Sequence, residues 1–109
     1  MPILKPGDVG TVLFAGASAT KRRPVVVVSS EEYQRHRPDV VVAVLTSKIP
    51  AAPTPFDHVL HDWAEAGLKH PSAFRAYFQT DLQAEATRIG RLSERDWAEV
   101  KAIVSKVLG

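Results

Sequence analysis

The sequence predicts a mainly β domain, a small and partly closed barrel of roughly five short strands with a helix packed on it. Four consecutive valines at residues 25–28 are typical of a strand that is buried on both faces. Residues 39–48 contain a second strongly apolar run, which we expect to be a central strand. Near the end of the chain, Ser93 is suited to cap a helix. The apolar face of this helix is predicted from residues at helical spacing, which are Trp97, Val100, Val104 and Val107, with Leu108.

The first elements lead to a cluster of cations. Residues 5–8 form a turn into a strand over residues 9–14, and a loop of small residues follows over residues 15–20. Pro24 has no N–H to donate to a β-ladder, so we expect it at the first position of the valine strand. The cations at residues 21–23 then sit at the end of a rigid strand.

A short helix should separate the two apolar strands. Ser29 and Glu32 have the spacing of a capping box, which predicts one or two helical turns. These turns should end before Pro38, because a proline disfavours helical backbone in the preceding residue. After the second apolar strand, residues 49–55 are rich in proline and predict an extended surface loop.

The second half of the chain predicts shorter elements. Residues 56–60 alternate weakly, as in an edge strand, and residues 61–68 predict a short helical turn that Gly67 closes. Two further strands are expected over residues 72–78 and 86–92. No repeat or low-complexity tract divides the sequence.

Composition limits the possible functions. A chain of 109 residues with 45% hydrophobic residues predicts one domain over residues 1–109 with a real core. It has no cysteine, which excludes disulfides, thiolate catalysis and cysteine-based metal sites. The 14 Lys and Arg against 12 Asp and Glu, a net charge of +2, permit a polyanionic partner. We expect a cytoplasmic protein without a membrane partner, since neither a signal peptide nor a membrane-spanning stretch is recognisable.

The cations Lys21, Arg22 and Arg23 form a candidate phosphate site. A guanidinium on rigid backbone offers two parallel donors to a phosphate and keeps its charge. The alternative is that these cations are solvated loop charges that protect an aggregation-prone strand.

The side chains that titrate near neutral pH are the four histidines, His36, His58, His61 and His70. Each is a candidate catalytic acid or base. His58 and His61 sit with Asp57 and Asp62 in the sequence, which makes a metal site conceivable. Such clusters in loops are usually solvated, so no metal and no cofactor are predicted.

Five segments, taken in order, resemble the MazF/PemK-like toxins over nearly the whole chain. They are residues 5–9, 21–29, 44–47, 71–75 and 89–93. The resemblance implies an SH3-like barrel of the plasmid-maintenance-toxin type with a C-terminal helix, assembled as a homodimer. It also implies the toxin half of a type II toxin–antitoxin pair, whose complex binds DNA. The implied activity is a metal-independent endoribonuclease that cuts single-stranded messenger RNA at short sequences.

The same resemblance implies roles for individual residues. Arg23 falls on the arginine at the strand entry, Thr46 on the threonine at a strand end, and Arg75 on an arginine that is catalytic in some members. Tyr77 stands where some of those members have a carboxylate, so no general base is assigned. The further residues expected to bind RNA are Lys21, Arg22, Ser47, Lys48, Phe56 and Ser72.

In the implied reaction, the substrate's 2′-hydroxyl attacks the adjacent phosphorus and leaves a cyclic phosphate and a 5′-hydroxyl. Arg23 suits stabilisation of the charged phosphorane, Thr46 can hydrogen-bond the substrate, and Arg75 can stabilise charge. Two alternatives stay open. One is a non-catalytic toxin of the same fold that binds DNA gyrase through the Trp97 helix, and the other is an inactive RNA-binding member, suggested by Tyr77.

Overall fold

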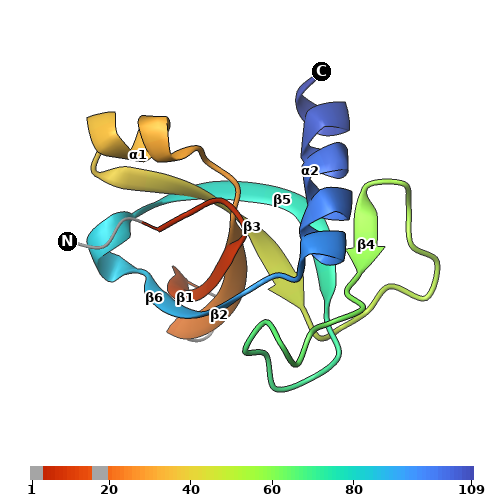
Figure 1. The fold of residues 1–109 in the computed structure, drawn as a ribbon. Coiled ribbons are helices and arrows are strands. Elements are labelled where there is room, and N and C mark those ends of the chain that lie inside the picture. The colour runs from red at the N-terminus through yellow and green to blue at the C-terminus, as the bar shows by residue number, and fades with distance from the viewer. Residues whose placement is uncertain (1–3, 16–19) are drawn as a thin grey trace.

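The computed structural model describes residues 4–15 and 20–109 of the chain (Figure 1). Part of the loop expected over residues 15–20 lies outside the described residues. The strands are β1 (Asp8–Ala15), β2 (Thr20–Val27), β3 (Asp39–Thr46), β4 (Asp57–Val59), β5 (Ala73–Leu82) and β6 (Thr87–Arg91). The helices are α1 (Glu31–His36), a 3₁₀ turn η1 (Gln83–Glu85) and α2 (Glu94–Leu108).

The six strands form one antiparallel sheet in the order β4-β5-β3-β2-β1-β6. The sheet bends strongly, with α2 beside β4 and β5 at one end (Figure 1). Among the described residues, no ladder joins β4 to β6, so the sheet curves like a barrel without closing. The predicted mainly β fold with a C-terminal helix is confirmed.

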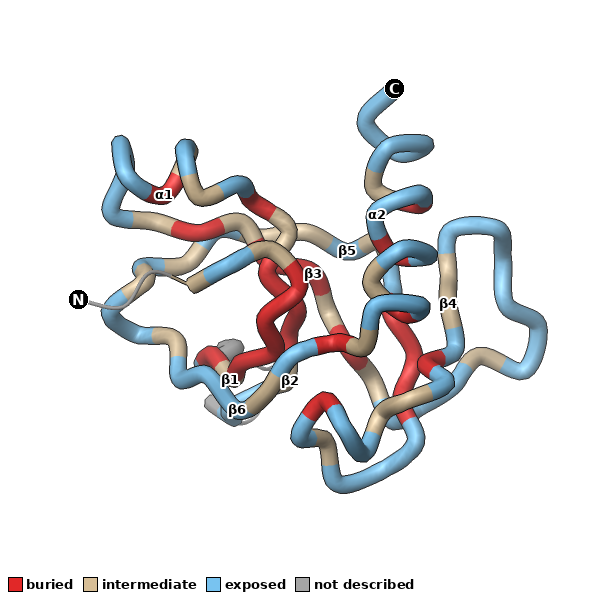
Figure 2. The backbone as a smooth tube through the Cα atoms, viewed as in Figure 1, coloured by how far each residue is buried: buried red, intermediate tan, exposed pale blue. Residues whose placement is uncertain are grey.

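The valine strand is buried on both faces, as its composition predicts. Val26 packs into one apolar cluster, with Phe74 of β5 and Val100 of α2. Val25 and Val27 point to the other face, into a second cluster with residues of β1 and β3. Figure 2 shows this buried segment running through the centre of the molecule. The rigid centre of the sheet therefore supports the chain on either side of it.

Pro24 was expected to begin the valine strand, and this prediction is wrong. β2 begins at Thr20, and Pro24 lies within it, opposite Thr11 of β1. The pairing of β2 with β3 starts only at Val25. A proline can sit there because the first half of β2 has no ladder on its β3 side and needs no N–H donor. The two strands therefore separate at Pro24, and a pocket opens between them.

Residues 61–68 contain the expected single turn, in which the Ala66 N–H donates to the carbonyl oxygen of Asp62 and Gly67 has a positive φ. Two other expectations need correction. Ser30, not Ser29, caps α1, because the Ser29 hydroxyl donates to Gln34 and accepts from the backbone of β3. On α2, Val100 and Ile103 are the buried apolar residues, whereas Val107 and Leu108 are exposed because the helix extends beyond the sheet.

The turns after β4 press against β6 at two glycines. Gly67 has a φ of +87°, which favours glycine. A Cβ on Gly90 would lie 2.1 Å from the carbonyl oxygen of Ala66. The close approach of these two backbones fixes the loop over residues 67–72 beside the sheet.

We expect Gly90→Ala to lower the free energy of unfolding by about 1–3 kcal/mol, because the new methyl group forces the two backbones apart. Urea unfolding followed by circular dichroism measures this change. Ala98→Ser is the control, since Ala98 is exposed on α2. Equal stability of the two variants would contradict the packing described.

Candidate functional site

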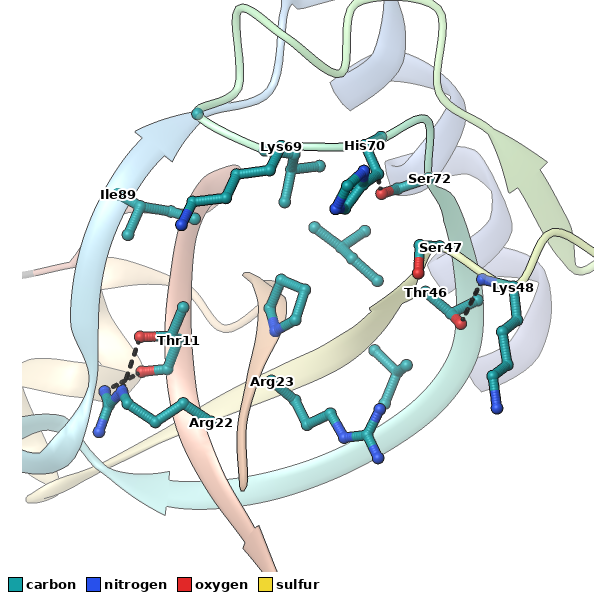
Figure 3. Close-up of a pocket in the computed structure, with 15 residues that line it drawn as sticks. Thr11, Arg22, Arg23, Thr46, Ser47, Lys48, Lys69, His70, Ser72 and Ile89 are labelled. Atoms are coloured by element: carbon teal, nitrogen blue, oxygen red, sulfur yellow. Dashed lines mark hydrogen bonds between the residues drawn. The ribbon is translucent and has the colours of Figure 1, made fainter. Parts of the chain in front are cut away.

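A pocket of about 710 Å³ opens where β2 and β3 separate (Figure 3). One wall comes from the first half of β2, and another comes from the end of β3 and the residues after it. The loop over residues 67–72 forms the side opposite β2, next to Ile89 of β6. Strand separation at Pro24 and the contact between Gly67 and Gly90 thus shape this pocket.

The pocket is strongly cationic. Its charged lining residues are Arg22, Arg23, Lys48 and Lys69. No Asp or Glu is among the described residues that line it. Cations that gather in a concave site without carboxylates attract anions, and phosphate groups above all.

Two neighbouring arginines have different roles in this pocket. Arg22 donates to the carbonyl oxygen of Thr11 at 2.7 Å and to the hydroxyl of Thr87 at 3.1 Å, which ties β1 to β6. Within the described part of the chain, no hydrogen bond or ion pair holds Arg23, which is exposed. Figure 3 shows the two side chains extending in different directions. Arg23 therefore keeps its donors for a ligand, whereas those of Arg22 are used in the fold.

Hydroxyl groups lie near these cations at the end of β3. The Thr46 Oγ1 accepts the backbone N–H of Lys48 at 3.1 Å, which orients the hydroxyl and leaves its proton free to be donated. Ser47 follows it and is exposed. Ser72 is buried, and its hydroxyl donates to the carbonyl oxygen of His70 at 2.9 Å. Ser72 thus fixes the turn that carries His70.

The pocket also contains Lys69, which sequence reasoning did not single out, and His70, which it named only as one of four candidate histidines. Lys69 and His70 reach it from the loop, and their side chains point into it (Figure 3). The sequence showed only a break before Pro71 at this point. The signal available was two basic residues directly before a segment that belongs to the resemblance.

The family model for the PemK-like, MazF-like toxin of type II toxin–antitoxin systems matches residues 5–108. The chain belongs to this family. Among curated protein sequences, none matches the chain. The family match covers the pocket and every element of the fold.

Solved structures of the PemK-like, MazF-like family share the fold. The MazE-MazF complex of Deinococcus radiodurans gives a TM-score of 0.76 at 20% identity, covering 96% of this chain and 95% of that one. An endoribonuclease in complex with its cognate antitoxin, from Mycobacterial species, gives a TM-score of 0.79 at 19% identity. That match covers 98% of this chain and 96% of the other. The Mycobacterium tuberculosis toxin MazF-mt6 gives a TM-score of 0.74 at 19% identity, and that match covers 93% of this chain and 95% of the other.

Neither helix of the described residues combines the length and the apolar composition that a membrane span requires.

Some residues that the family resemblance implicates lie outside the pocket. Arg75 lies opposite Asp57 in the β4–β5 ladder, and its guanidinium is 3.5 Å from that carboxylate. Lys21 and Phe56 are exposed and do not line the pocket, and Lys106 lies over the Phe56 ring. Within one chain, the structure therefore brings Arg23 and Thr46 together but does not bring Arg75 to them.

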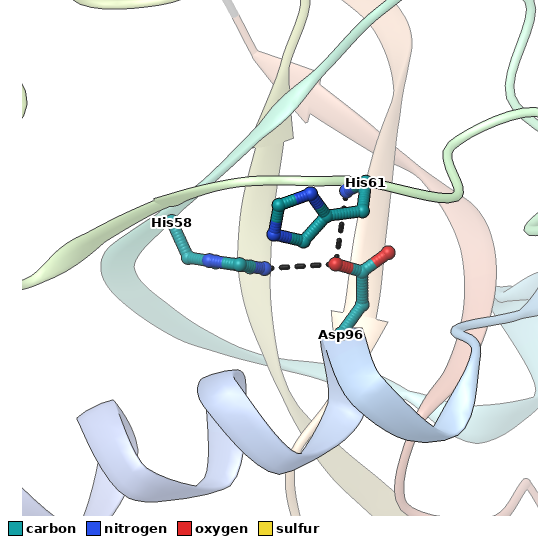
Figure 4. Close-up of side chains that lie close together, drawn as sticks. All are labelled: His58, His61 and Asp96. Atoms are coloured by element: carbon teal, nitrogen blue, oxygen red, sulfur yellow. Dashed lines mark hydrogen bonds and ion pairs between the residues drawn. The ribbon is translucent and has the colours of Figure 1, made fainter.

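The conceivable metal site has a different composition from the one the sequence suggested. His58 and His61 meet Asp96 of α2, not Asp57 and Asp62 (Figure 4). Asp96 is fully buried, and its carboxylate accepts from His58 Nε2 at 2.8 Å and from the backbone N–H groups of His61 and Asp62. Since a carboxylate can only accept, His58 carries its proton on Nε2. These bonds tie the segment after β4 to the start of α2.

Asp62 reinforces the same junction. Arg95 of α2 donates to both of its oxygens at 2.7 Å, and the Ser93 hydroxyl donates at 2.6 Å. The Arg95 fork and then the Ser93 hydroxyl hold the pKa of Asp62 well below its usual range. For Asp96, burial alone would raise the pKa, but the hydrogen bonds from His61, His58 and Asp62 outweigh it and lower the pKa.

These carboxylates predict loss of stability in acid. The groups with a lowered pKa in the folded chain are Asp39, Asp57, Asp62 and Asp96. The stabilisation that these carboxylates give is present above the pKa of about 4 that Asp has in the unfolded chain. It is lost as the pH falls through their lower pKa values in the folded chain. Urea midpoints should therefore fall steadily between about pH 5 and pH 2. Asp62→Asn should show a weaker fall, and an equal fall would contradict the role of the Arg95 pair.

Proposed function

We propose that the protein is the toxin of a type II toxin–antitoxin pair and a metal-independent endoribonuclease that cuts single-stranded messenger RNA. The observation that carries this proposal is the cationic pocket, which holds the oriented Thr46 hydroxyl and an Arg23 side chain that no described residue engages. Family membership supports the toxin role, and a structural neighbour from Mycobacterial species is an endoribonuclease.

The pocket offers most of what cleavage through a cyclic phosphate requires. The attack of the 2′-hydroxyl places negative charge on the non-bridging oxygens of the phosphorane. Arg23 can donate two parallel hydrogen bonds to these oxygens, and fixed donors of this kind are a major source of catalysis. The Thr46 hydroxyl can donate to a phosphate oxygen or align the 2′-hydroxyl. Lys48 and Lys69 add positive charge for the flanking phosphates.

The proposed partners are a second copy of the chain and a cognate antitoxin. Two structural neighbours are complexes of a toxin with its antitoxin. An acidic, disordered antitoxin tail would be attracted to the cationic pocket and would compete with RNA for Arg23 and Lys48. In a two-fold dimer, the RNA would run over both subunits, which could bring Arg75 or Phe56 of one copy toward RNA held by the other.

The decisive experiment incubates the purified protein with a long single-stranded RNA in EDTA and maps the fragment ends. The proposal predicts cuts at discrete sequences that leave 2′,3′-cyclic phosphate and 5′-hydroxyl ends. The Arg23→Ala variant, purified in the same way, reports contaminating nucleases. Intact RNA with folded, antitoxin-free protein would contradict the proposal and favour a toxin of the same fold that acts by protein binding.

A further inference from the structure

The pocket lacks an obvious group to take the proton from the 2′-hydroxyl. No carboxylate of the described residues lines it, and Tyr77, at the position of the carboxylate in some family members, is 72% exposed and is not part of the lining. Lysine and arginine keep their protons at neutral pH, and the hydroxyls of threonine and serine are poor bases. Histidine is the side chain that ordinarily exchanges a proton near neutrality, and His70 lines the pocket.

The position of His70 is well fixed. Its carbonyl oxygen accepts the buried Ser72 hydroxyl, and Pro71 follows it. The close contact between Gly67 and Gly90 holds the start of the same loop against β6. Figure 3 shows the imidazole turned into the pocket, across from the side chains of Arg23 and Thr46. The imidazole and the Arg23 side chain therefore stand on opposite sides of the pocket, and RNA that fills it would meet both.

The other histidines do not lie in the pocket. His58 Nε2 is bonded to the buried Asp96, His61 lies beside that pair, and His36 is exposed on α1. The residues outside the described ranges, 1–3 and 16–19, include no histidine, Asp or Glu. Within a single chain, His70 is therefore the one imidazole that lines the pocket.

We propose that His70 is the general base of RNA cleavage, an inference that rests on the proposed nuclease function. Its unprotonated ring nitrogen takes the proton of the 2′-hydroxyl as that oxygen bonds to phosphorus. The bond from phosphorus to the 5′-oxygen breaks, and the 5′-oxygen takes a proton from water. The imidazolium then returns its proton to solvent, so the enzyme is regenerated.

The test measures single-turnover cleavage of one RNA in EDTA between pH 5 and pH 9. His70→Gln should lower the rate by a factor of about 10² to 10⁴, the usual contribution of a general base. The wild-type rate should rise with pH and then level off, and His70→Gln should lack this rise. Imidazole added to the buffer should restore part of the activity of His70→Ala. RNA affinity should change little.

The pH profile has to be attributed to His70 rather than to its neighbours. The charged groups that face it are Lys69 on its own loop, Arg22 and Arg23 on β2, and Lys48 after β3. These cations do not ordinarily titrate between pH 5 and pH 8. His36→Gln is the matched control and should keep the full rate and the same profile. Urea midpoints of all variants show whether the fold is retained.

The outcomes separate the two proposals. If the wild-type protein cleaves RNA and folded His70→Gln stays within about threefold of it, the general-base role fails and the nuclease function stands. A slow His70→Gln variant that keeps the pH-dependent rise, with no imidazole rescue of His70→Ala, would also overturn it and would indicate a positioning role. If the wild-type protein cuts no RNA, the nuclease proposal fails and the inference fails with it.

Discussion

Replacing Arg23 with alanine should lower the rate of RNA cleavage by a factor of about 10² to 10³, the usual cost of removing one fixed donor to a developing oxyanion. The reason is that, of the two arginines that line the pocket, Arg23 is the one whose donors no described residue uses. Its loss should leave the free energy of unfolding nearly unchanged, because no hydrogen bond or ion pair among the described residues depends on it. Single-turnover cleavage and urea unfolding measure the two effects.

Arg22 provides the matched control, since it is the adjacent residue with the same side chain. Arg22→Ala should lower stability by about 1 kcal/mol, because the guanidinium links Thr11 to Thr87, and should lower cleavage less than Arg23→Ala does. Arg23→Lys should recover only part of the activity, since an ammonium lacks the planar fork. Cleavage by Arg23→Ala at the wild-type rate would remove Arg23 from the site.

Local pattern was sufficient to predict the strands but not their pairing. Four valines in a row have no polar face, so residues 25–28 could only form a strand covered on both sides. The place of Pro24 depended on where the ladder to β3 stops, which is set by a segment twenty residues away along the chain. By sequence Ser29 is the better cap, since Glu32 completes a capping box with it, yet Ser30 is the residue that caps α1. The contact of Ser29 with Gln34 and β3 decides between them.

The part of the candidate site that strands form could be predicted from the sequence. Arg23 and Thr46 lie on adjacent strands at the point of separation, and both line the pocket. The cation cluster beside the valine run indicated Arg23, and the family resemblance indicated Thr46. The loop with Lys69 and His70 could not be placed, because a contact between backbones at Gly67 and Gly90 sets its position and no side-chain pattern encodes it. Arg75 shows the reverse case. The family resemblance implies a catalytic role for it, but within one chain its guanidinium pairs with Asp57 outside the pocket.

Replacing Asp96 with alanine should cost about 3–5 kcal/mol of folding free energy, because each donor left without its buried acceptor costs about 1–3 kcal/mol. Asp96 is fully buried and unites three donors, His58 Nε2 and the backbone N–H groups of His61 and Asp62. Without it, two N–H groups and the imidazole are left unpaired beside the start of α2. The segment that leads to the Lys69–His70 loop loses its anchor, so cleavage should fall together with stability.

Urea unfolding by circular dichroism tests this, and Glu99→Ala is the control, because Glu99 is an exposed carboxylate on the same helix. Glu99→Ala should change the free energy of unfolding by no more than about 0.5 kcal/mol. Asp96→Asn should be intermediate, since one amide oxygen can still accept whereas the amide nitrogen opposes a donor. If Asp96→Ala is as stable as Glu99→Ala, the three bonds do not hold α2 to the sheet, and packing of Val100 and Ile103 alone secures the helix.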